Sequence, residues 1–327
     1  MRFQFYSEAL DNVPKLSVDG TVSNSIHLSH WQGNTTPPEV KADTSTEITL
    51  NVVASPNRAT LTNNIDLVTN NHFDADGVLS VWTMLNGERA LEYRDLLISA
   101  AEAGDFSEHT SDDGVRVSIA IQGSDQAGGE DKDTSPLAAF LAGHDVNDDA
   151  GAYDLVLPEV ERLLSNVNAY ESLWGEGWRS VVEANESFAR GESNIVEHED
   201  SRISLITLAP NVTNPSMSIA KHARGEMFLI ATPASGGWLY SLDYPYYSWA
   251  ETVVRPRIRR RDLSNALELL NDRESNREGR WQTDNREMTS AVKFLSNGTL
   301  AASRLEPDQV VSVLQTSGSL AATSAVS

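Results

Sequence analysis

Short apolar segments alternate with helical patterns along most of the chain. Runs with the length and composition of strands occur at residues 2–6, 15–19, 25–30, 66–69, 115–121, 203–208, 227–231 and 238–242. Apolar residues recur at helical spacing after Gly77, through 88–103, over most of 135–190 and through 262–274. Residues 43–47 resemble a helix N-cap with a carboxylate in the first turn. The alternation predicts an α/β fold with a partly parallel sheet flanked by helices.

The domain organisation follows from length and from shifts in pattern. A chain of 327 residues suits one large domain or two modest ones. We expect an α/β domain over residues 1–235 and a smaller C-terminal α+β portion over 236–314. The tail at 315–327 is rich in Ser, Ala and Thr, and we expect it to be disordered.

Composition excludes several classes of site and partner. The chain has no cysteine, so disulfides, thiolate zinc sites and cysteine nucleophiles are excluded, and a metal would be held by oxygen and imidazole. The net charge of -22 repels long duplex nucleic acid and anionic membranes. No apolar run approaches the ~20 residues of a membrane span, and the N-terminus lacks the pattern of a secretory signal. We therefore expect a soluble cytoplasmic protein.

The strongest chemical signal is the segment His72-Phe-Asp-Ala-Asp-Gly-Val-Leu-Ser80. His72, Asp74 and Asp76 occupy alternate positions at the end of an expected strand, so their side chains can converge. A helix follows Gly77, and α/β sheets place their sites at such strand ends. Crowded carboxylates repel each other unless a cation is present, which favours a divalent-metal site. The alternative is that Asp74 and Asp76 form only an Asx-turn and helix cap, with His72 packed beside them.

The segment resembles the first motif of DHH-type phosphoesterases, which His72, Asp74, Asp76, Gly77 and Ser80 match position by position. The resemblance implies a DHH-phosphoesterase-like fold and a hydrolase with two divalent metals, manganese or magnesium, that acts on a phosphodiester or phosphoanhydride. Asp74 and Asp76 would then be catalytic as well as metal ligands. The chain contains neither an Asp-His-His triplet nor a Gly-Gly-Gly-His segment, so the remaining ligands must come from elsewhere. Our candidates are Asp105 and then His144 or its neighbour Asp145.

Over most of its length the chain is similar to an uncharacterised bacterial family of unknown function. That similarity implies no activity. The segments that carry it are Leu28-Ser-His-Trp31, Thr36-Pro37, Asn71-His-Phe-Asp74, Ala101-Glu-Ala-Gly-Asp-Phe106 and Ser248-Trp249.

Two alternatives concern the 72–80 segment and His30. Phe73–Leu79 also resembles the first motif of haloacid-dehalogenase-type phosphatases, in which Asp74 would be the nucleophile and Asp76 the acid/base. His30 is an additional candidate ligand, although the sequence favours the alternative, a hydrogen-bonded histidine beside Trp31.

Arginines are densest at residues 255–261. Their forked guanidinium groups suit phosphate oxygens, so Arg255 and Arg257 are candidate substrate ligands. Salt bridges to this protein's many acids are the alternative. Two hypotheses for the function follow from these motifs. The first is a metal-dependent enzyme whose partner is a phosphorylated small molecule or short nucleotide. The second is a relative that binds such a ligand without turnover.

Overall fold

The computed structural model describes residues 1–124, 135, 137, 148–284 and 288–317. Contacts between residues group the chain into two compact units. The first unit comprises residues 1–182 and 249–256, and the second comprises 183–248 and the chain from Arg257 onward. The expected boundary between residues 235 and 236 concerns independently folding domains and stays a prediction. Of the tail expected to be disordered at 315–327, residues 315–317 lie in helix α11 (Pro307–Ser317), and the rest lies outside the described residues.

The first unit contains a four-stranded sheet. Its order is β1-β4-β2-β3, and each neighbouring pair is parallel. The four strands are β1 (Arg2–Phe3), β4 (Leu67–Thr69), β2 (Leu16–Val18) and β3 (Ile26–Leu28). Every residue of β2 and β4 is buried, as is usual for parallel strands covered on both faces. The predicted α/β class with a parallel sheet is confirmed, whereas likeness to the DHH fold stays a prediction.

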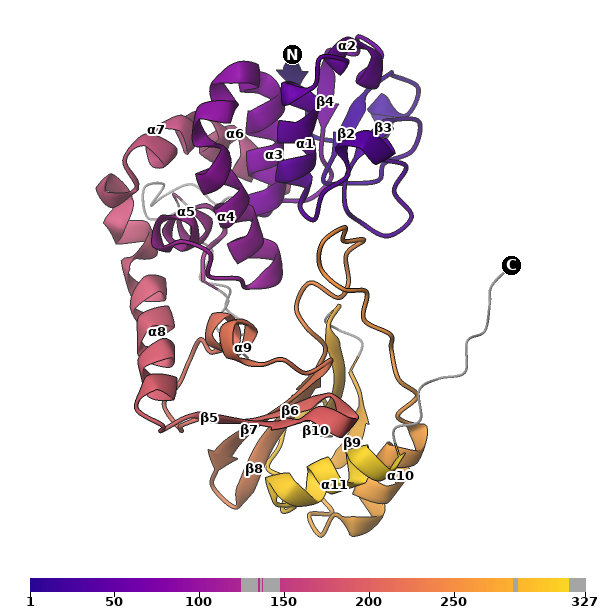
Figure 1. Ribbon diagram of the computed structural model, residues 1–327, viewed down its shortest axis with the longest axis vertical. Coiled ribbons are helices and arrows are strands. Elements are labelled where there is room, and N and C mark those ends of the chain that lie inside the picture. Colours follow the sequence, from indigo (N-terminus) through magenta and orange to yellow (C-terminus); the bar gives the residue numbers. More distant parts are fainter. Residues whose placement is uncertain (125–134, 136, 138–147, 285–287, 318–327) are drawn as a thin grey trace. The chain divides into compact units, whose positions relative to one another are not determined.

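Helices accompany this sheet, and α3 packs against β1, β2 and β4 while α1 and α4 pack against α3 (Figure 1). The helices are α1 (Ser45–Ala54), α2 (Arg58–Leu61), α3 (Ala75–Asn86), α4 (Arg94–Phe106), α5 (Asp112–Gln122), α6 (Asp149–Val156), α7 (Val160–Ser165) and α8 (Glu171–Ala189), the last of which continues into the second unit. Side-chain caps begin four of them. Thr44 accepts the amide hydrogen of residue 47, Asp74 that of residue 77, Ser111 that of residue 114, and Asp148 that of residue 151.

The strand expected at residues 115–121 is wrong, because these residues lie in α5. Ser111 caps this helix, and it is buried on nearly every side, so its apolar residues do not reveal a helical period. Gly114 allows α5 to approach α4 closely, since a Cβ there would lie 2.1 Å from the Oγ atom of Ser99. The helical pattern at 88–103 divides into a 3-10 segment, Gly87–Tyr93, and α4, which continues past Gly104.

The second unit is built on a mixed sheet of order β11-β10-β8-β7-β6-β5, with β9 paired to β10. Only β6 and β7 run parallel among these pairs of described strands. The strands are β5 (Asn194–His198), β6 (Ile203–Thr207), β7 (Met227–Ala234), β8 (Gly237–Asp243), β9 (Arg280–Thr283), β10 (Ser290–Ser296) and β11 (Thr299–Leu300). The strands expected at 203–208, 227–231 and 238–242 are confirmed.

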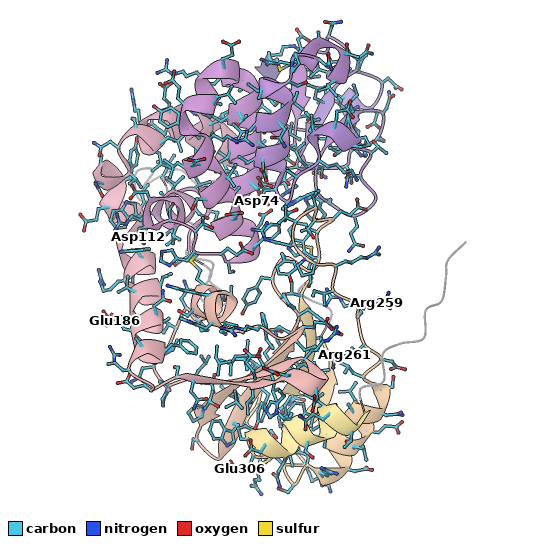
Figure 2. All side chains as sticks on the ribbon, in the orientation of Figure 1. Asp74, Asp112, Glu186, Arg259, Arg261 and Glu306 are labelled. Atoms are coloured by element: carbon cyan, nitrogen blue, oxygen red, sulfur yellow. The ribbon has the colours of Figure 1, made fainter. Side chains whose placement is uncertain are left out.

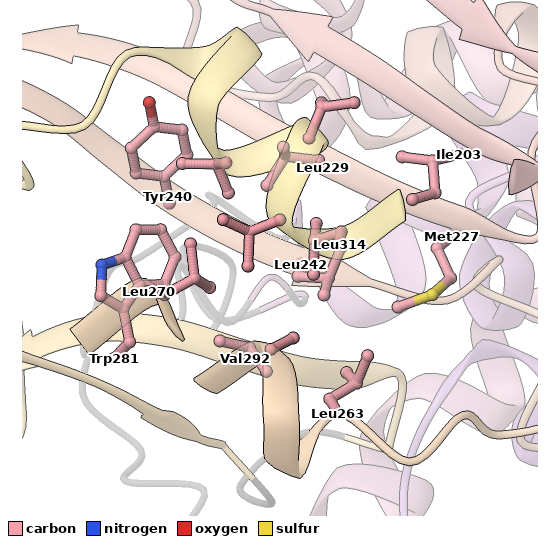
Figure 3. Close-up of a cluster of buried hydrophobic side chains, with 14 of the residues drawn as sticks. Ile203, Met227, Leu229, Tyr240, Leu242, Leu263, Leu270, Trp281, Val292 and Leu314 are labelled. Carbon is pink, nitrogen blue, oxygen red and sulfur yellow. The ribbon is translucent and has the colours of Figure 1, made fainter. Parts of the chain in front are cut away.

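The helices of the second unit are α9 (Ser216–His222), α10 (Ser264–Arg273) and α11 (Pro307–Ser317). Alternate residues of the strands supply two separate cores. Leu205 and Leu229 belong to the larger core. This core also includes Leu263, which directly precedes α10, Leu270 of α10 and Leu314 of α11 (Figure 3). Their strand neighbours Ile206 and Phe228 belong to the smaller core, which includes Ile219 of α9. The helix expected at 262–274 is confirmed by α10.

Among the described residues, no helix combines the length and apolar character needed to cross a membrane.

Candidate metal centre

Three parallel strands of the first unit end at one edge of the sheet, and each is followed by a polar residue of the candidate centre. Asp19 follows β2 directly, His30 follows β3 by two residues, and the 72–76 segment follows β4. Because the carboxyl ends of parallel strands meet at one edge of the sheet, the residues that follow them lie close together, and α/β sheets place their ligand sites there. The last turn of α4 adds Asp105.

The first group of possible ligands comprises Asp19, His30, Asp76 and Asp105, whose ligand atoms all lie within 4.8 Å of one another. The Nε2 atom of His30 lies 3.1 Å from Asp105 Oδ2, 3.4 Å from Asp19 Oδ1 and 3.7 Å from Asp76 Oδ2. His30, Asp19 and Asp76 are buried and the Asp105 side chain is only 6% exposed. Three carboxylates therefore surround one imidazole nitrogen with almost no access to water.

The second group comprises Asp19, His72 and Asp74, again within 4.8 Å of one another. The Nε2 atom of His72 lies 2.9 Å from Asp19 Oδ2 and 3.1 Å from Asp74 Oδ2. Asp74 stands at the N-terminus of α3 (Figure 2). Asp19 thus belongs to both groups, with Oδ1 toward His30 and Oδ2 toward His72.

Backbone amides at two helix N-termini hold these carboxylates in place. The two oxygens of Asp76 accept the amide hydrogens of Ser45 and Thr46, both at 2.7 Å, in the first turn of α1. Asp74 Oδ1 accepts the Gly77 amide hydrogen at 2.7 Å. The helix cap expected as an alternative to metal binding is therefore present at Asp74. It uses only one of the two oxygens and leaves Oδ2 beside His72.

The environment of His30 orients its ring for coordination. Its Nδ1 atom lies 2.6 Å from the carbonyl oxygen of Asp43, so Nδ1 donates and Nε2 is directed at the carboxylates. Although His30 Nε2 and Asp105 Oδ2 are at ion-pair distance, neither buried atom makes a hydrogen bond. Buried polar atoms are rarely left in this condition, and a cation bound between them would satisfy both.

Burial and mutual repulsion shift the carboxyl pKa values in the direction that favours added positive charge. Burial, together with the charge of Asp19, raises the pKa of Asp76 to about 7. Burial and the neighbouring Asp76 carboxylate raise the pKa of Asp105 well above its usual range. Both carboxyl groups hold a proton more readily than exposed aspartates do.

The histidines and Asp19 form the ionised part of the cluster. Burial alone would lower the pKa of His72, but the charges of Asp74 and Asp19 outweigh it and raise the pKa to about 11. Burial is similarly outweighed at His30, whose pKa nearby Asp105 and Asp19 hold well above its usual range. At Asp19, burial is outweighed by the two histidines, which lower the pKa. Bound metal would replace these protons, and the imidazole and carboxylate donors suit Mn, Mg or Zn.

The structure brings together some of the predicted site residues. His72 and Asp74 fall in one group, whereas Asp76 falls in the other together with Asp105, so the three residues expected to converge are divided between the two groups. Their roles as ligands or catalytic groups stay predictions. His144, with its neighbour Asp145, lies outside the described residues.

The two arginines of the expected substrate clamp lie in different units. Arg257 is exposed in the second unit. Arg255 lies in the first unit and donates hydrogen bonds to Asp43, Glu102 and Glu108. It therefore forms the internal ion pairs that were the alternative to substrate binding, and a substrate contact by either arginine stays a prediction.

Sequence reasoning missed Asp19, the residue shared by the two groups. It was included only as the last position of an expected strand. One available signal was an acidic residue before Gly20 at a strand end, the same arrangement that drew attention to Asp76 and Gly77. Asp19 also has a φ of 54°, a conformation uncommon outside glycine, Asn and Asp, and such backbone outliers cluster at functional sites.

The model of a family of unknown function (DUF6687) matches residues 1–316. The chain belongs to this family. The expected membership of an uncharacterised family is confirmed, and the DUF6687 description names no activity. No curated protein matches the chain. One solved structure, the pGpG-specific phosphodiesterase PggH from Vibrio cholerae, is 10% identical with a TM-score of 0.36, covering 92% of this chain and 82% of that chain. A TM-score this low does not indicate a shared fold.

Proposed function

We propose that this DUF6687 protein is a metal-dependent phosphoesterase-like hydrolase whose two divalent ions share Asp19. The observation that carries the proposal is the presence of Asp19 in both groups of possible ligands. A carboxylate that offers one oxygen to each of two sites is a common bridge in two-metal centres. The expected substrate is a phosphodiester or phosphoanhydride, from a phosphorylated small molecule or short nucleotide, and the expected metal is manganese or magnesium.

The donor set supports this class of chemistry. His30, Asp76 and Asp105 would hold one ion with Asp19, and His72 and Asp74 would hold the other. Two bound divalent ions supply a polarised phosphoryl oxygen and a nucleophilic hydroxide at neutral pH. The motif at 72–80 and its resemblance to DHH-type phosphoesterases point to the same reaction, with Asp74 and Asp76 as the proposed catalytic carboxylates.

Each surrounding group has a defined part in this arrangement. The Asp43 carbonyl fixes the neutral tautomer of His30 with its proton on Nδ1, so Nε2 would bind metal once its own proton is displaced. The amides of α1 orient both oxygens of Asp76 and partly offset its charge in the absence of metal. Among the described residues, Arg255 is already neutralised by three carboxylates, so bound metal would supply the main charge compensation for a phosphate dianion.

Metal analysis and a generic substrate test the proposal. The purified chain should bind two Mn²⁺ ions after chelation and reloading, and it should then hydrolyse bis(4-nitrophenyl) phosphate. Asp19→Asn should lose both ions and the activity. The matched control is Asp112→Asn, which removes one charge from a 63% exposed carboxylate outside both groups. This variant should keep two ions and full activity.

The metal-free melting temperature separates loss of ligands from loss of fold. Asparagine has nearly the shape of aspartate and also adopts the positive φ of this position, so a folded metal-free variant is expected. Two bound ions in Asp19→Asn, or none in the parent, would contradict the proposal. Metal binding without hydrolysis of phosphodiesters or pyrophosphate would instead favour the non-catalytic phosphorylated-ligand module. A phosphoryl group trapped on Asp74 would favour the haloacid-dehalogenase-type reaction.

A further inference from the structure

A short segment from the second half of the sequence belongs to the first unit. Residues Trp249–Pro256, hereafter the strap, group with residues 1–182, although the chain on either side of the strap belongs to the second unit. The strap contacts the loop after β3 repeatedly. Gln32 donates a hydrogen bond to the Trp249 carbonyl, and Glu251 accepts hydrogen bonds from the Gly33 amide and from Asn34. These contacts join the strap to the segment that carries His30.

The strap also touches His30 itself. The Glu251 amide donates to the His30 carbonyl oxygen at 2.7 Å. The Trp249 ring packs edge-on against the imidazole, with ring centroids 4.9 Å apart. The third restraint on His30 is the hydrogen bond from Nδ1 to the Asp43 carbonyl. Imidazole orientation therefore depends on both the strap and Asp43.

Asp43 is in turn held by the strap. Its carboxylate accepts the backbone amide hydrogens of Val253, Val254 and Arg255. The same carboxylate accepts a hydrogen bond from Arg255 Nη1 at 2.8 Å. Burial of Asp43 raises its pKa, but these donors outweigh burial and lower it, so the residue stays ionised. The Asp43 carboxylate thus accepts four hydrogen bonds from the strap, while the carbonyl of the same residue orients His30.

Arg255 extends this network to Asp105. Its guanidinium donates to Glu102 at 2.7 Å and to Glu108 at 2.8 and 2.6 Å. These two acids flank Asp105 in the sequence, on the last turns of α4 and just beyond it. The guanidinium also lies 4.7 Å from the centroid of the Phe106 ring. Because it is only 15% exposed, these contacts are shielded from solvent.

We infer that the strap is the positioning element of the group around His30, and that Arg255 sets its metal affinity by fixing His30 and Asp105 together. The inference rests on the proposed metal centre. It assigns Arg255 a positioning role in place of direct contact with substrate. Residues that orient metal-bound histidines and carboxylates typically change metal affinity about 10–100-fold when removed.

The test measures Mn²⁺ binding to the full chain by calorimetry. Arg255→Ala should weaken Mn²⁺ binding at the site that contains His30 and Asp105 by about 10-fold or more. One of the two dissociation constants should therefore rise by this factor, and the other should change less. Arg255→Lys keeps the charge but cannot fork between three carboxylates, so its affinity should be intermediate. The matched control is Arg261→Ala, which removes another buried guanidinium, 7% exposed, from the second unit. Its Mn²⁺ affinity should equal that of the parent.

A metal-free readout separates this inference from the proposed function. In ¹⁵N-histidine spectra of the metal-free chain, the slowly exchanging Nδ1 proton of His30 should be visible. It can be assigned by its absence in His30→Gln. Arg255→Ala should lose it and Arg261→Ala should keep it. No Mn²⁺ binding to the parent would overturn the proposed function and, with it, the role in metal affinity. Parent-like Mn²⁺ binding by a folded Arg255→Ala, or an unchanged Nδ1 proton, would overturn the strap inference alone.

Discussion

Replacing Gly77 by alanine should destabilise the first unit through a defined steric conflict. A Cβ atom at this position would lie 2.4 Å from Asn70 Nδ2, 2.7 Å from Tyr153 Oη and 3.0 Å from Asp74 Oδ1. Asn70 and Tyr153 are buried and hydrogen-bonded to each other at 2.9 Å, so neither can swing into solvent. Asn70 also accepts the amide hydrogens of Asn71 and, more weakly, of residue 72. The conflict would therefore be transmitted to His72.

The expected magnitude comes from two opposing effects. Overpacking a tight site costs about 1–3 kcal/mol, whereas alanine in a helix is about 1 kcal/mol more favourable than glycine. Two of the three contacts are shorter than 3.0 Å and involve buried groups, so we place the overpacking cost at about 2–3 kcal/mol and expect a net loss of about 1–2 kcal/mol in the free energy of unfolding. In a unit of this length, that corresponds to a fall in melting temperature of about 2–8 °C.

Urea denaturation of the metal-free chain measures the effect, with Gly175→Ala as control. The nearest atom to a Cβ at Gly175 is Glu171 Cγ at 3.4 Å, an ordinary contact, so this helical substitution should stabilise. Tyr153→Phe removes one of the clashing atoms, and Gly77→Ala should cost less in that background. A Gly77→Ala variant as stable as the parent, with no coupling to Tyr153, would refute the reasoning.

Four further outcomes are expected. Metal binding must displace the proton that Asp76 holds with a pKa of about 7 and the one that His72 holds with a pKa of about 11, so Mn²⁺ affinity should rise with pH in calorimetric titrations. Without metal, the folded chain keeps these two protons at pH values where the unfolded chain has lost them, so the free energy of unfolding should fall as pH rises. The fall due to Asp76 should lie between pH 3.8 and about 7, and the fall due to His72 between pH 6.5 and about 11. A free energy of unfolding that rises over pH 4–7 would contradict this. Ser111→Ala should lower the unfolding free energy by about 1 kcal/mol in denaturant titrations, because α5 loses its N-cap. Gly237→Ala should destabilise the second unit by about 1–3 kcal/mol or more, since φ is +154° and a Cβ would lie 2.0 Å from the Ser303 carbonyl oxygen, yet Mn²⁺ affinity should be unchanged.

Local sequence was sufficient for the elements whose pattern is set within a few residues. The 66–69 strand and the helix that follows it could be predicted because a buried strand, a capping aspartate and a helical period are all local features, although the helix begins at Ala75 and not after Gly77. The same reasoning predicted that His72, Asp74 and Asp76 would converge, whereas His72 and Asp74 fall in one group of possible ligands and Asp76 falls in the other. It failed at residues 115–121, where a helix buried on nearly every side carries no period that separates it from a strand.

The composition of the candidate centre was decided by tertiary structure. Asp19 and His30 join the motif because β2 pairs with β4 and β3 pairs with β2, and nothing within a single strand specifies which parallel strand lies beside it. Arg255 gave the same sequence signal whether it contacted a ligand or an internal acid. Its place among Asp43, Glu102 and Glu108 depends on contacts across about 150 to 210 positions of the chain, which only the fold brings together. The sequence by itself determined the type of donor at the 72–76 segment, and the order of the strands determined which partners those donors have.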